Sequence, residues 1–289
     1  MLSAKIIYLV GVFINILTMN VVKYVGINGI LSVEEMICMR ACLATLILLP
    51  FNVKQMISLK NEDKKTLFLL LCLGFVAMLD SYMWNIGIQT VPLNNAMILL
   101  FVSPIITAIM SCIFLKEKIS ISVALKFVIN IFAIFLIYHF SIGQLTIGYF
   151  YLMSDFIIYG IIAILIKKLN KFSSDFLVFI RLIILLPISF IIMHKVPLFN
   201  FKVVIFILII TFGYIIERTF ITLAFKMTSV VEIQPLRYFN IVFSSFLSYL
   251  ILGERLTNMQ IIGSIIIIFG GIIVDVIAKK ILYLKSISV

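Results

Sequence analysis

Ten stretches of about 20 apolar residues follow one another along this chain, and short polar segments separate them. An α-helix needs roughly 20 apolar residues to cross the hydrocarbon core of a bilayer, which is about 30 Å thick. A spanning segment must also satisfy its own backbone hydrogen bonds, which favours helices. The sequence therefore predicts an all-α polytopic membrane protein with ten transmembrane helices. The predicted spans are residues 4–24, 33–51, 66–88, 93–115, 120–139, 147–166, 174–194, 202–225, 229–252 and 258–277.

The composition agrees with a chain that folds in lipid. Of its 289 residues, 64% are hydrophobic and only 12% are charged, and the mean hydropathy is +1.27. Soluble domains are roughly 45–50% apolar. The lipid bilayer is therefore the expected environment of this protein.

Basic residues lie mainly in the loops on one side of the predicted membrane. With the N-terminus inside, fourteen lysines fall on the cytoplasmic side, and only Lys23, Lys195, Lys202 and Arg255 fall opposite. This bias predicts that both termini are cytoplasmic and that residues 52–65 form the one sizeable inner loop. The net charge of +11 is explained by topology in this way, so we expect no nucleic-acid partner.

The sequence contains no pattern typical of an enzyme or a metal site. It has no His-Glu-x-x-His motif, no Gly-x-Ser-x-Gly motif and no phosphate-binding Gly-Lys-Ser/Thr loop. Its four cysteines lie within predicted spans, without the spacing of metal ligands. We therefore expect no catalytic residue, no metal and no cofactor.

The two halves of the chain resemble each other. Without gaps, at an offset of 137 residues, Glu117 aligns with Glu254 and Asp80 with Glu217. Because each half holds an odd number of spans, five, the second half enters the membrane from the opposite side. An inverted repeat of this kind is typical of secondary transporters. The two predicted five-helix repeats cover residues 1–140 and 147–280.

A second alignment extends the repeat to the early helices. At an offset of 141 residues, Ser32 and Arg40 align with Ser173 and Arg181. Both arginines lie about six residues inside their predicted spans, where a long side chain can reach the interface. We therefore interpret them as interfacial anchors.

With these features the chain resembles the drug/metabolite transporter (DMT) superfamily, in particular its EamA-type transporters. The resemblance covers nearly the whole chain and rests on the five-plus-five helices, an arginine early in each half, and a proline, Pro104, thirteen residues before the acidic helix end at Glu117. The second half closes on Gly253-Glu254-Arg255-Leu256. Two positions depart from the pattern: Lys116 where the family often has glycine, and Ile241 where symmetry with Pro104 calls for proline. The resemblance implies a transporter of the cell inner membrane.

The stretch Pro235-Leu236-Arg237-Tyr238 resembles the ninth helix of a narrower branch. That branch includes the S-adenosylmethionine uptake transporters of intracellular bacteria. The resemblance implies transport of S-adenosylmethionine by exchange.

Several charged residues lie inside predicted spans, where they should face a wet cavity or a partner. Two carboxylates share a helix face with an aromatic ring one turn away, and Tyr214 stands in the same relation to Arg218. For Asp80 and Glu217 the alternatives are ligand or ion coupling and a structural pair with Arg218 or Arg237. Arg237 itself suits either a substrate anchor or a salt bridge to Glu217 or Glu232. The predicted substrate-binding residues are Asp80, Trp84, Asp155, Tyr159, Tyr214, Glu217, Arg218, Arg237 and Tyr238.

These side-chain types favour a small amphoteric metabolite as the substrate. Carboxylates and aromatic rings attract a cation, and arginine binds a carboxylate or phosphate through its planar fork. S-adenosylmethionine taken up by exchange is the leading candidate, although amino acids and nucleoside-like solutes fit nearly as well. The alternatives are a proton-coupled exporter of amino acids or drugs and, outside transport, a membrane scaffold protein.

Three further features concern helix ends and contacts. We expect Glu117 and Glu254 to bind the N-terminus of an adjacent helix rather than a substrate. Pro104 and Pro235 predict a kink or gate within their helices. Gly270-Gly271 predicts a close helix contact, either with the fifth span or at a dimer seam, so the protein is expected to be a monomer or a homodimer.

Overall fold

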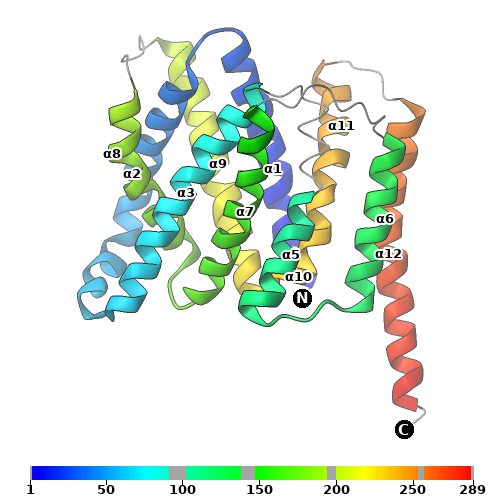
Figure 1. The fold of residues 1–289 in the computed structure, drawn as a ribbon. Coiled ribbons are helices and arrows are strands. Elements are labelled where there is room, and N and C mark those ends of the chain that lie inside the picture. The colour runs from blue at the N-terminus through cyan, green and yellow to red at the C-terminus, as the bar shows by residue number, and fades with distance from the viewer. Residues whose placement is uncertain (1, 91–101, 138–146, 194–199, 253–256, 288–289) are drawn as a thin grey trace.

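The structure is a computed structural model that describes residues 2–90, 102–137, 147–193, 200–252 and 257–287. The described residues form helices joined by short connections, with no strand among them (Figure 1). The α-helices are α1 (Leu2–Ile27), α2 (Val33–Ser58), α3 (Lys64–Thr90), α5 (Val102–Leu115), α6 (Ile121–Ile137), α7 (Ile147–Lys168), α8 (Ser174–Ile192), α9 (Phe201–Met227), α10 (Val230–Ile233), α11 (Phe239–Leu252) and α12 (Asn258–Ile287). Two 3₁₀ segments, η1 (Leu59–Asn61) and η2 (Gln234–Tyr238), complete the set.

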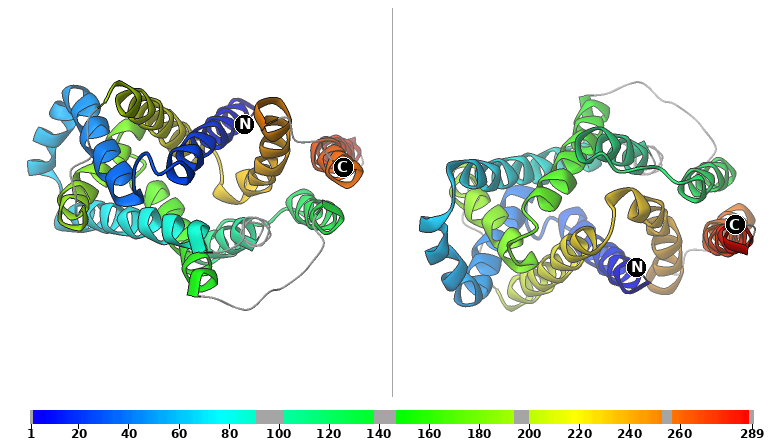
Figure 2. Two further views of the ribbon diagram at one scale, coloured as in Figure 1. Left: turned by 90° about the horizontal axis from the view of Figure 1, so that it is seen from above. Right: turned by 90° about the horizontal axis from the view of Figure 1, so that it is seen from below.

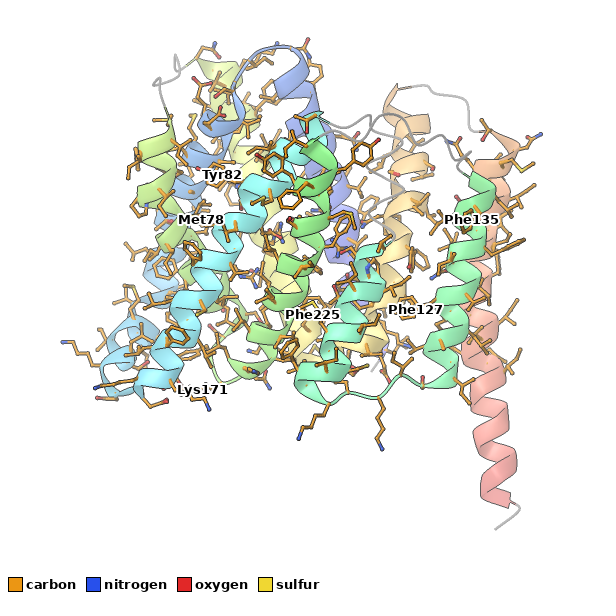
Figure 3. All side chains as sticks on the ribbon, viewed as in Figure 1. Met78, Tyr82, Phe127, Phe135, Lys171 and Phe225 are labelled. Atoms are coloured by element: carbon orange, nitrogen blue, oxygen red, sulfur yellow. The ribbon has the colours of Figure 1, made fainter. Side chains whose placement is uncertain are left out.

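Helices of membrane-spanning length dominate the chain. Within the described ranges, seven helices are long and apolar enough to cross a bilayer, and α5 and α6 are shorter apolar helices. Each of the ten predicted spans overlaps a described helix. Apolar side chains such as Ile121, Phe132 and Ile191 are exposed. Side chains project outward from the helices around the bundle (Figure 3), where lipid replaces water as the solvent. The protein is an all-α polytopic membrane protein.

Two helix ends differ from the sequence prediction. The first is the C-terminal end of α2, which continues through Pro50 to Ser58, so the predicted inner loop 52–65 is mostly helical. Gln55 and Ser173 exchange two hydrogen bonds there, and these contacts hold the extended end of α2 against the start of α8. The second is the end of α12, which continues ten residues past its predicted end to Ile287.

The helix contacts that join the two halves come in symmetric pairs. The α1–α9 contact has a counterpart in α7–α3, and α5–α7 has a counterpart in α11–α1. The pairs α2–α8 and α6–α12 each join equivalent helices of the two halves. These two pairs lie at opposite ends of the elongated bundle (Figure 2), and the remaining helices surround its centre.

The predicted ninth span, 229–252, is not one helix. It consists of the single turn α10, the 3₁₀ segment η2 that contains Pro235, and then α11. Proline lacks an N–H and cannot continue the ladder, so the backbone tightens into a 3₁₀ turn. The amide of Asn130 in α6 donates to the carbonyl oxygen of Pro235 at 3.2 Å. The expected kink is therefore a break in the helix, and the neighbouring helix α6 binds the carbonyl group of Pro235 at this break.

Glu117 binds the N-terminal end of α10, as the sequence predicted. Its carboxylate accepts hydrogen bonds from the backbone N–H groups of Val230 and Val231 at 3.1 and 3.0 Å, and from the Ser229 hydroxyl at 2.8 Å. This contact attaches the end of α5 to the start of the broken helix. Glu254, its counterpart in the second half, lies outside the described residues.

The α6–α12 contact uses the glycine singled out in the sequence. A Cβ on Gly270 would lie 2.6 Å from Cγ2 of Ile129 in α6, whereas a Cβ on Gly271 would meet nothing within 4 Å. For Gly270 the structure thus shows the predicted contact with the fifth span. At one end of this pair, Asp275 forms ion pairs with Lys5 and Lys126, an interaction that the sequence analysis missed.

Candidate substrate-binding cavity

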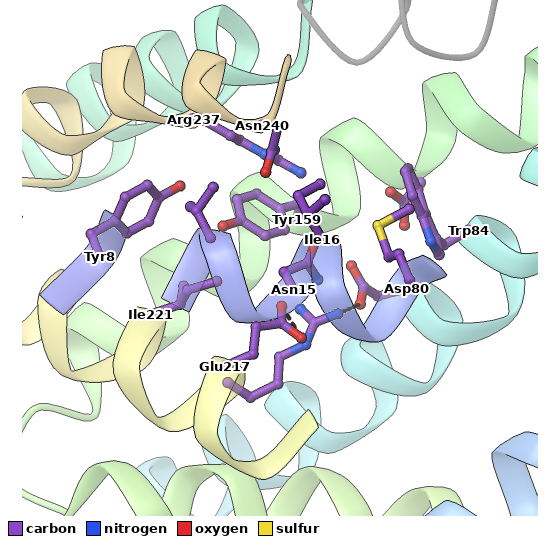
Figure 4. A pocket seen from close by; sticks show the side chains of 14 residues that line it. Tyr8, Asn15, Ile16, Asp80, Trp84, Tyr159, Glu217, Ile221, Arg237 and Asn240 are labelled. Carbon is purple, nitrogen blue, oxygen red and sulfur yellow. Dashed lines mark ion pairs between the residues drawn. The ribbon is translucent and has the colours of Figure 1, made fainter. Parts of the chain in front are cut away.

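A cavity opens at the centre of the bundle, between helices of both halves (Figure 4). The helix α1 contributes the most residues to it. The lining residues are Tyr8, Val12, Asn15, Ile16, Met19, Asp80, Trp84, Asp155, Tyr159, Glu217, Arg218, Ile221, Arg237 and Asn240.

The two symmetry-related carboxylates reach this cavity from equal depths in their helices. Asp80 and Glu217 each occupy the seventeenth position of a 27-residue helix, α3 and α9 respectively. Both are buried, so each must find a partner or a wet cavity inside the bundle.

Arg218 is that partner for both carboxylates. Its Nη2 lies 3.5 Å from Oδ2 of Asp80, and its Nε lies 3.5 Å from Oε1 of Glu217. The guanidinium group also lies over the ring of Tyr214, 5.5 Å from the ring centroid. The sequence left open whether these carboxylates couple to a ligand or ion or form a structural pair with an arginine. The structure contains ion pairs of both carboxylates with Arg218.

Asp155 is the third carboxylate of the cavity, and it is less well bound. Its side chain is 2% exposed, and its Oδ1 has no hydrogen-bond donor among the described residues. It lies close enough to Asp80 for the two carboxyl groups to interact electrostatically. A carboxyl group in this position is able to take up a proton or to face a cationic group of a ligand.

Arg237 lies on the other side of the cavity from Asp80 and Glu217 (Figure 4). Its guanidinium group stacks on the ring of Tyr159, with Cζ 3.8 Å from the centroid, and its Nη1 donates to Ser103 at 2.6 Å. Within the described ranges, no carboxylate lies within 4 Å of it. The salt bridge to Glu217 or Glu232 that the sequence left open is therefore not formed among these residues.

The first helix provides polar groups that the sequence analysis missed. Tyr8 is fully buried and forms a side-chain hydrogen bond with Tyr159, while Asn15 lines the same cavity. An asparagine within an apolar span is a signal that a membrane-specific scan would find. Tyr8 gives no such signal, because many aromatic residues occupy the spans.

Seven of the nine predicted site residues line the cavity, and the two tyrosines Tyr214 and Tyr238 do not. Tyr238 follows Arg237 in a 3₁₀ turn, where neighbouring residues point about 120° apart. Its ring is buried against Phe127 of α6 at a centroid distance of 6.3 Å. Tyr214 lies behind the cavity wall, between Arg218 and Arg40.

Arg40 and Arg181 are not the interfacial anchors that the sequence predicted. Arg181 is only 4% exposed, and Cζ of Arg40 lies 4.2 Å from the ring centroid of Tyr214. Arg40 lies over a ring of α9 and Arg181 is buried, so both side chains point into the protein rather than to the interface.

A bundle of apolar helices that encloses charged residues at mid-depth, with a broken helix beside them, is the arrangement of a secondary transporter. The family model described as the EamA-like transporter family matches residues 3–139 and 146–274. The chain belongs to this family, whose members are membrane transporters.

The search of solved structures shows the same fold. One of the matches, entitled "Crystal structure of protein", has a TM-score of 0.78 and covers 96% of this chain and 98% of its own, at 10% sequence identity. At this identity the likeness concerns the fold alone. No curated protein matches the chain.

Proposed function

We propose that this EamA-like transporter moves a small amphoteric metabolite across the cell inner membrane by alternating access, with S-adenosylmethionine uptake by exchange as the leading candidate. The observation that carries the proposal is the separation of charge in the cavity. Arg237 faces it without a carboxylate partner among the described residues, and Asp80 and Glu217 lie across from it (Figure 4). A ligand with a carboxylate at one end and a cationic group at the other matches this arrangement.

The aromatic residues support the same class of ligand. Tyr159 and Trp84 line the cavity next to the charged groups. Ring faces attract cations such as ammonium or sulfonium by about 0.5–2 kcal/mol and also stack on planar groups. S-adenosylmethionine contains a sulfonium, an ammonium, a carboxylate and an adenine ring, so each side-chain type has a counterpart in it.

Alternating access needs two halves that move against each other, and we propose that these are the inverted repeats 1–140 and 147–280. The packing supports this division, because contacts between the two halves come in pairs related by the repeat, such as α1–α9 with α3–α7. Ser32 and Ser173, equivalent in the sequence, are the N-caps of α2 and α8. The N-terminal end of α1, the C-terminal end of α12 and Lys171 lie at one end of the bundle (Figures 1 and 3), which supports cytoplasmic termini.

The test is uptake of labelled S-adenosylmethionine into proteoliposomes that contain the purified protein. We expect uptake that depends on S-adenosylmethionine or its demethylated product inside the vesicles and that is competed weakly by ordinary amino acids. Uptake of amino acids alone would support the amphoteric class and reject this substrate. Absence of flux for the whole panel would favour the non-transporting scaffold.

A proton-coupled exporter is the second candidate, and Asp155 is the observation in its favour. A buried carboxylate with an unpaired oxygen can exchange a proton as the cavity opens to either side. Asp155→Asn should then abolish transport driven by a proton gradient and leave exchange intact. Loss of both activities would assign Asp155 to substrate binding instead.

A further inference from the structure

Behind the wall of the cavity, three arginines surround Tyr214. Arg40 lies over the Tyr214 ring at 4.2 Å and Arg218 at 5.5 Å, and Arg181 interacts with the same tyrosine electrostatically. We call Arg40, Arg181 and Arg218 around Tyr214 the arginine cluster. Arg40 and Arg181 come from α2 and α8, and neither lines the cavity. Arg40 and Arg181 therefore lie outside the lining of the candidate substrate site, whereas Arg218 belongs to both the cavity and the cluster.

The donors of the cluster outnumber its acceptors. Nε and Nη2 of both Arg40 and Arg181 are buried without a hydrogen-bond acceptor among the described residues. The buried hydroxyl of Tyr82, which interacts electrostatically with Arg40, also has no hydrogen-bond partner among the described residues. Buried donors usually have acceptors, because an unpaired polar group costs about 1–3 kcal/mol and a charged one costs more. Four of these unpaired atoms are guanidinium nitrogens, which can only donate, and this indicates an acceptor between α2, α3 and α8.

Among the described residues, no carboxylate forms an ion pair with Arg40 or Arg181. Asp80 acts electrostatically on both arginines and Glu217 acts on Arg40, and both carboxylates form their ion pairs with Arg218. Around the cavity and the cluster, the described side chains include four guanidinium groups and three carboxylates. Among these seven described side chains, the positive charges therefore outnumber the negative charges by one. A water molecule could accept hydrogen bonds there, but it would not balance the charge.

We propose that the arginine cluster binds one small monovalent anion of the size of chloride. The anion accepts hydrogen bonds from Arg40 or Arg181 and neutralises the excess charge between α2 and α8. These two helices are symmetry-related in the proposed repeats, so the anion stabilises the contact between the two halves. This anion site does not depend on which solute the protein transports.

The experiment measures the thermal unfolding midpoint of the purified full-length protein in detergent. Potassium chloride replaces potassium gluconate at constant ionic strength. We expect the midpoint to rise saturably with chloride, by about 2–4 °C, because a ligand that binds only the folded state stabilises it. The Arg40→Gln/Arg181→Gln variant should lose this rise. Lys202→Gln should keep it, because Lys202 is an exposed cation at the start of α9.

An equal midpoint of the wild-type protein in chloride and gluconate would overturn the proposal. A chloride-dependent rise that persists in the double arginine variant would overturn it as well. Should that variant fail to fold, crystals of the wild-type protein grown in bromide decide the matter through anomalous scattering. A bromide peak at Arg40 or Arg181 supports the site, and its absence there refutes it.

Discussion

Two groups of charges inside the predicted spans differ in whether the protein itself supplies every partner. In the first group, Asp275 binds Lys5 and Lys126 and accepts a hydrogen bond from Ser122 at 3.4 Å, which ties α12 to α6 and α1. In the central cavity, Arg237 has no carboxylate partner among the described residues, and Asp155 has an unpaired oxygen.

The difference indicates two uses of charge in a membrane protein. A charge whose partners all come from the chain holds helices together, and its removal should lower stability without changing ligand affinity. A charge that the chain leaves without a partner faces a cavity and is available to a ligand. Three substitutions of charged residues test this distinction, and Gly270→Val tests the α6–α12 contact that Asp275 reinforces. They follow in order of decreasing expected effect.

Arg237→Gln should have the largest effect, and the effect should fall on transport. Loss of a charge-assisted hydrogen bond of about 1.5–3 kcal/mol predicts a rise in KM of about 10–100-fold. Arg237→Lys retains the charge but loses the planar fork, so it should lie between the variant and the wild type. Initial uptake rates over a range of substrate concentrations measure the effect. An unchanged KM would remove Arg237 from the binding site.

Gly270→Val should act on stability, because the added side chain collides with Ile129. Overpacking of this kind destabilises by about 1–3 kcal/mol. Gly271→Val is the matched control and should change the unfolding midpoint little, since a Cβ there meets open space. Equal midpoints for the two variants would contradict the packing of α6 against α12.

Asp275→Asn should also lower stability, by a smaller amount. It leaves the buried Lys126 without its carboxylate, but the Asp275 side chain is 41% exposed, so solvent screens part of the loss. We expect about 1–2 kcal/mol, with an unchanged KM. Adding Lys126→Met to this variant should recover part of the midpoint. A large rise in KM would show that this ion cluster is coupled to the substrate site.

Glu117→Gln should have the smallest effect. The amide keeps one acceptor oxygen, but its NH2 group replaces the other, so one of the hydrogen bonds to the N–H groups of Val230 and Val231 is lost together with the attraction of the negative charge. We expect a cost of about 1 kcal/mol. Because α10 leads into the turn that carries Arg237, KM should rise no more than a few-fold. A loss of transport as large as that of Arg237→Gln would mean that Glu117 positions the site directly.

Much of the architecture follows from local properties of the sequence. The length and apolarity of the spans predict helices, because the bilayer offers no partner for an unpaired backbone group. The position of Glu117 at a helix end predicts its contact with an adjacent helix. The rarity of charges inside the spans identifies Asp80, Asp155 and Arg237 as groups that point inward.

Only the tertiary structure decides which of these inward groups meet. Arg218 lies between Asp80 and Glu217, Tyr238 turns away from Arg237, and Tyr8 reaches the cavity from α1. Spacing along one helix determines which residues share its face, but it contains no information about the neighbouring helix that this face meets. The burial of Arg181 shows the same limit. Its position near the end of a predicted span favoured an interfacial location, but the side chain is buried where α2 packs against α8. Partner choice is a property of the packed bundle, because pairing energies depend on distances between segments far apart in the sequence.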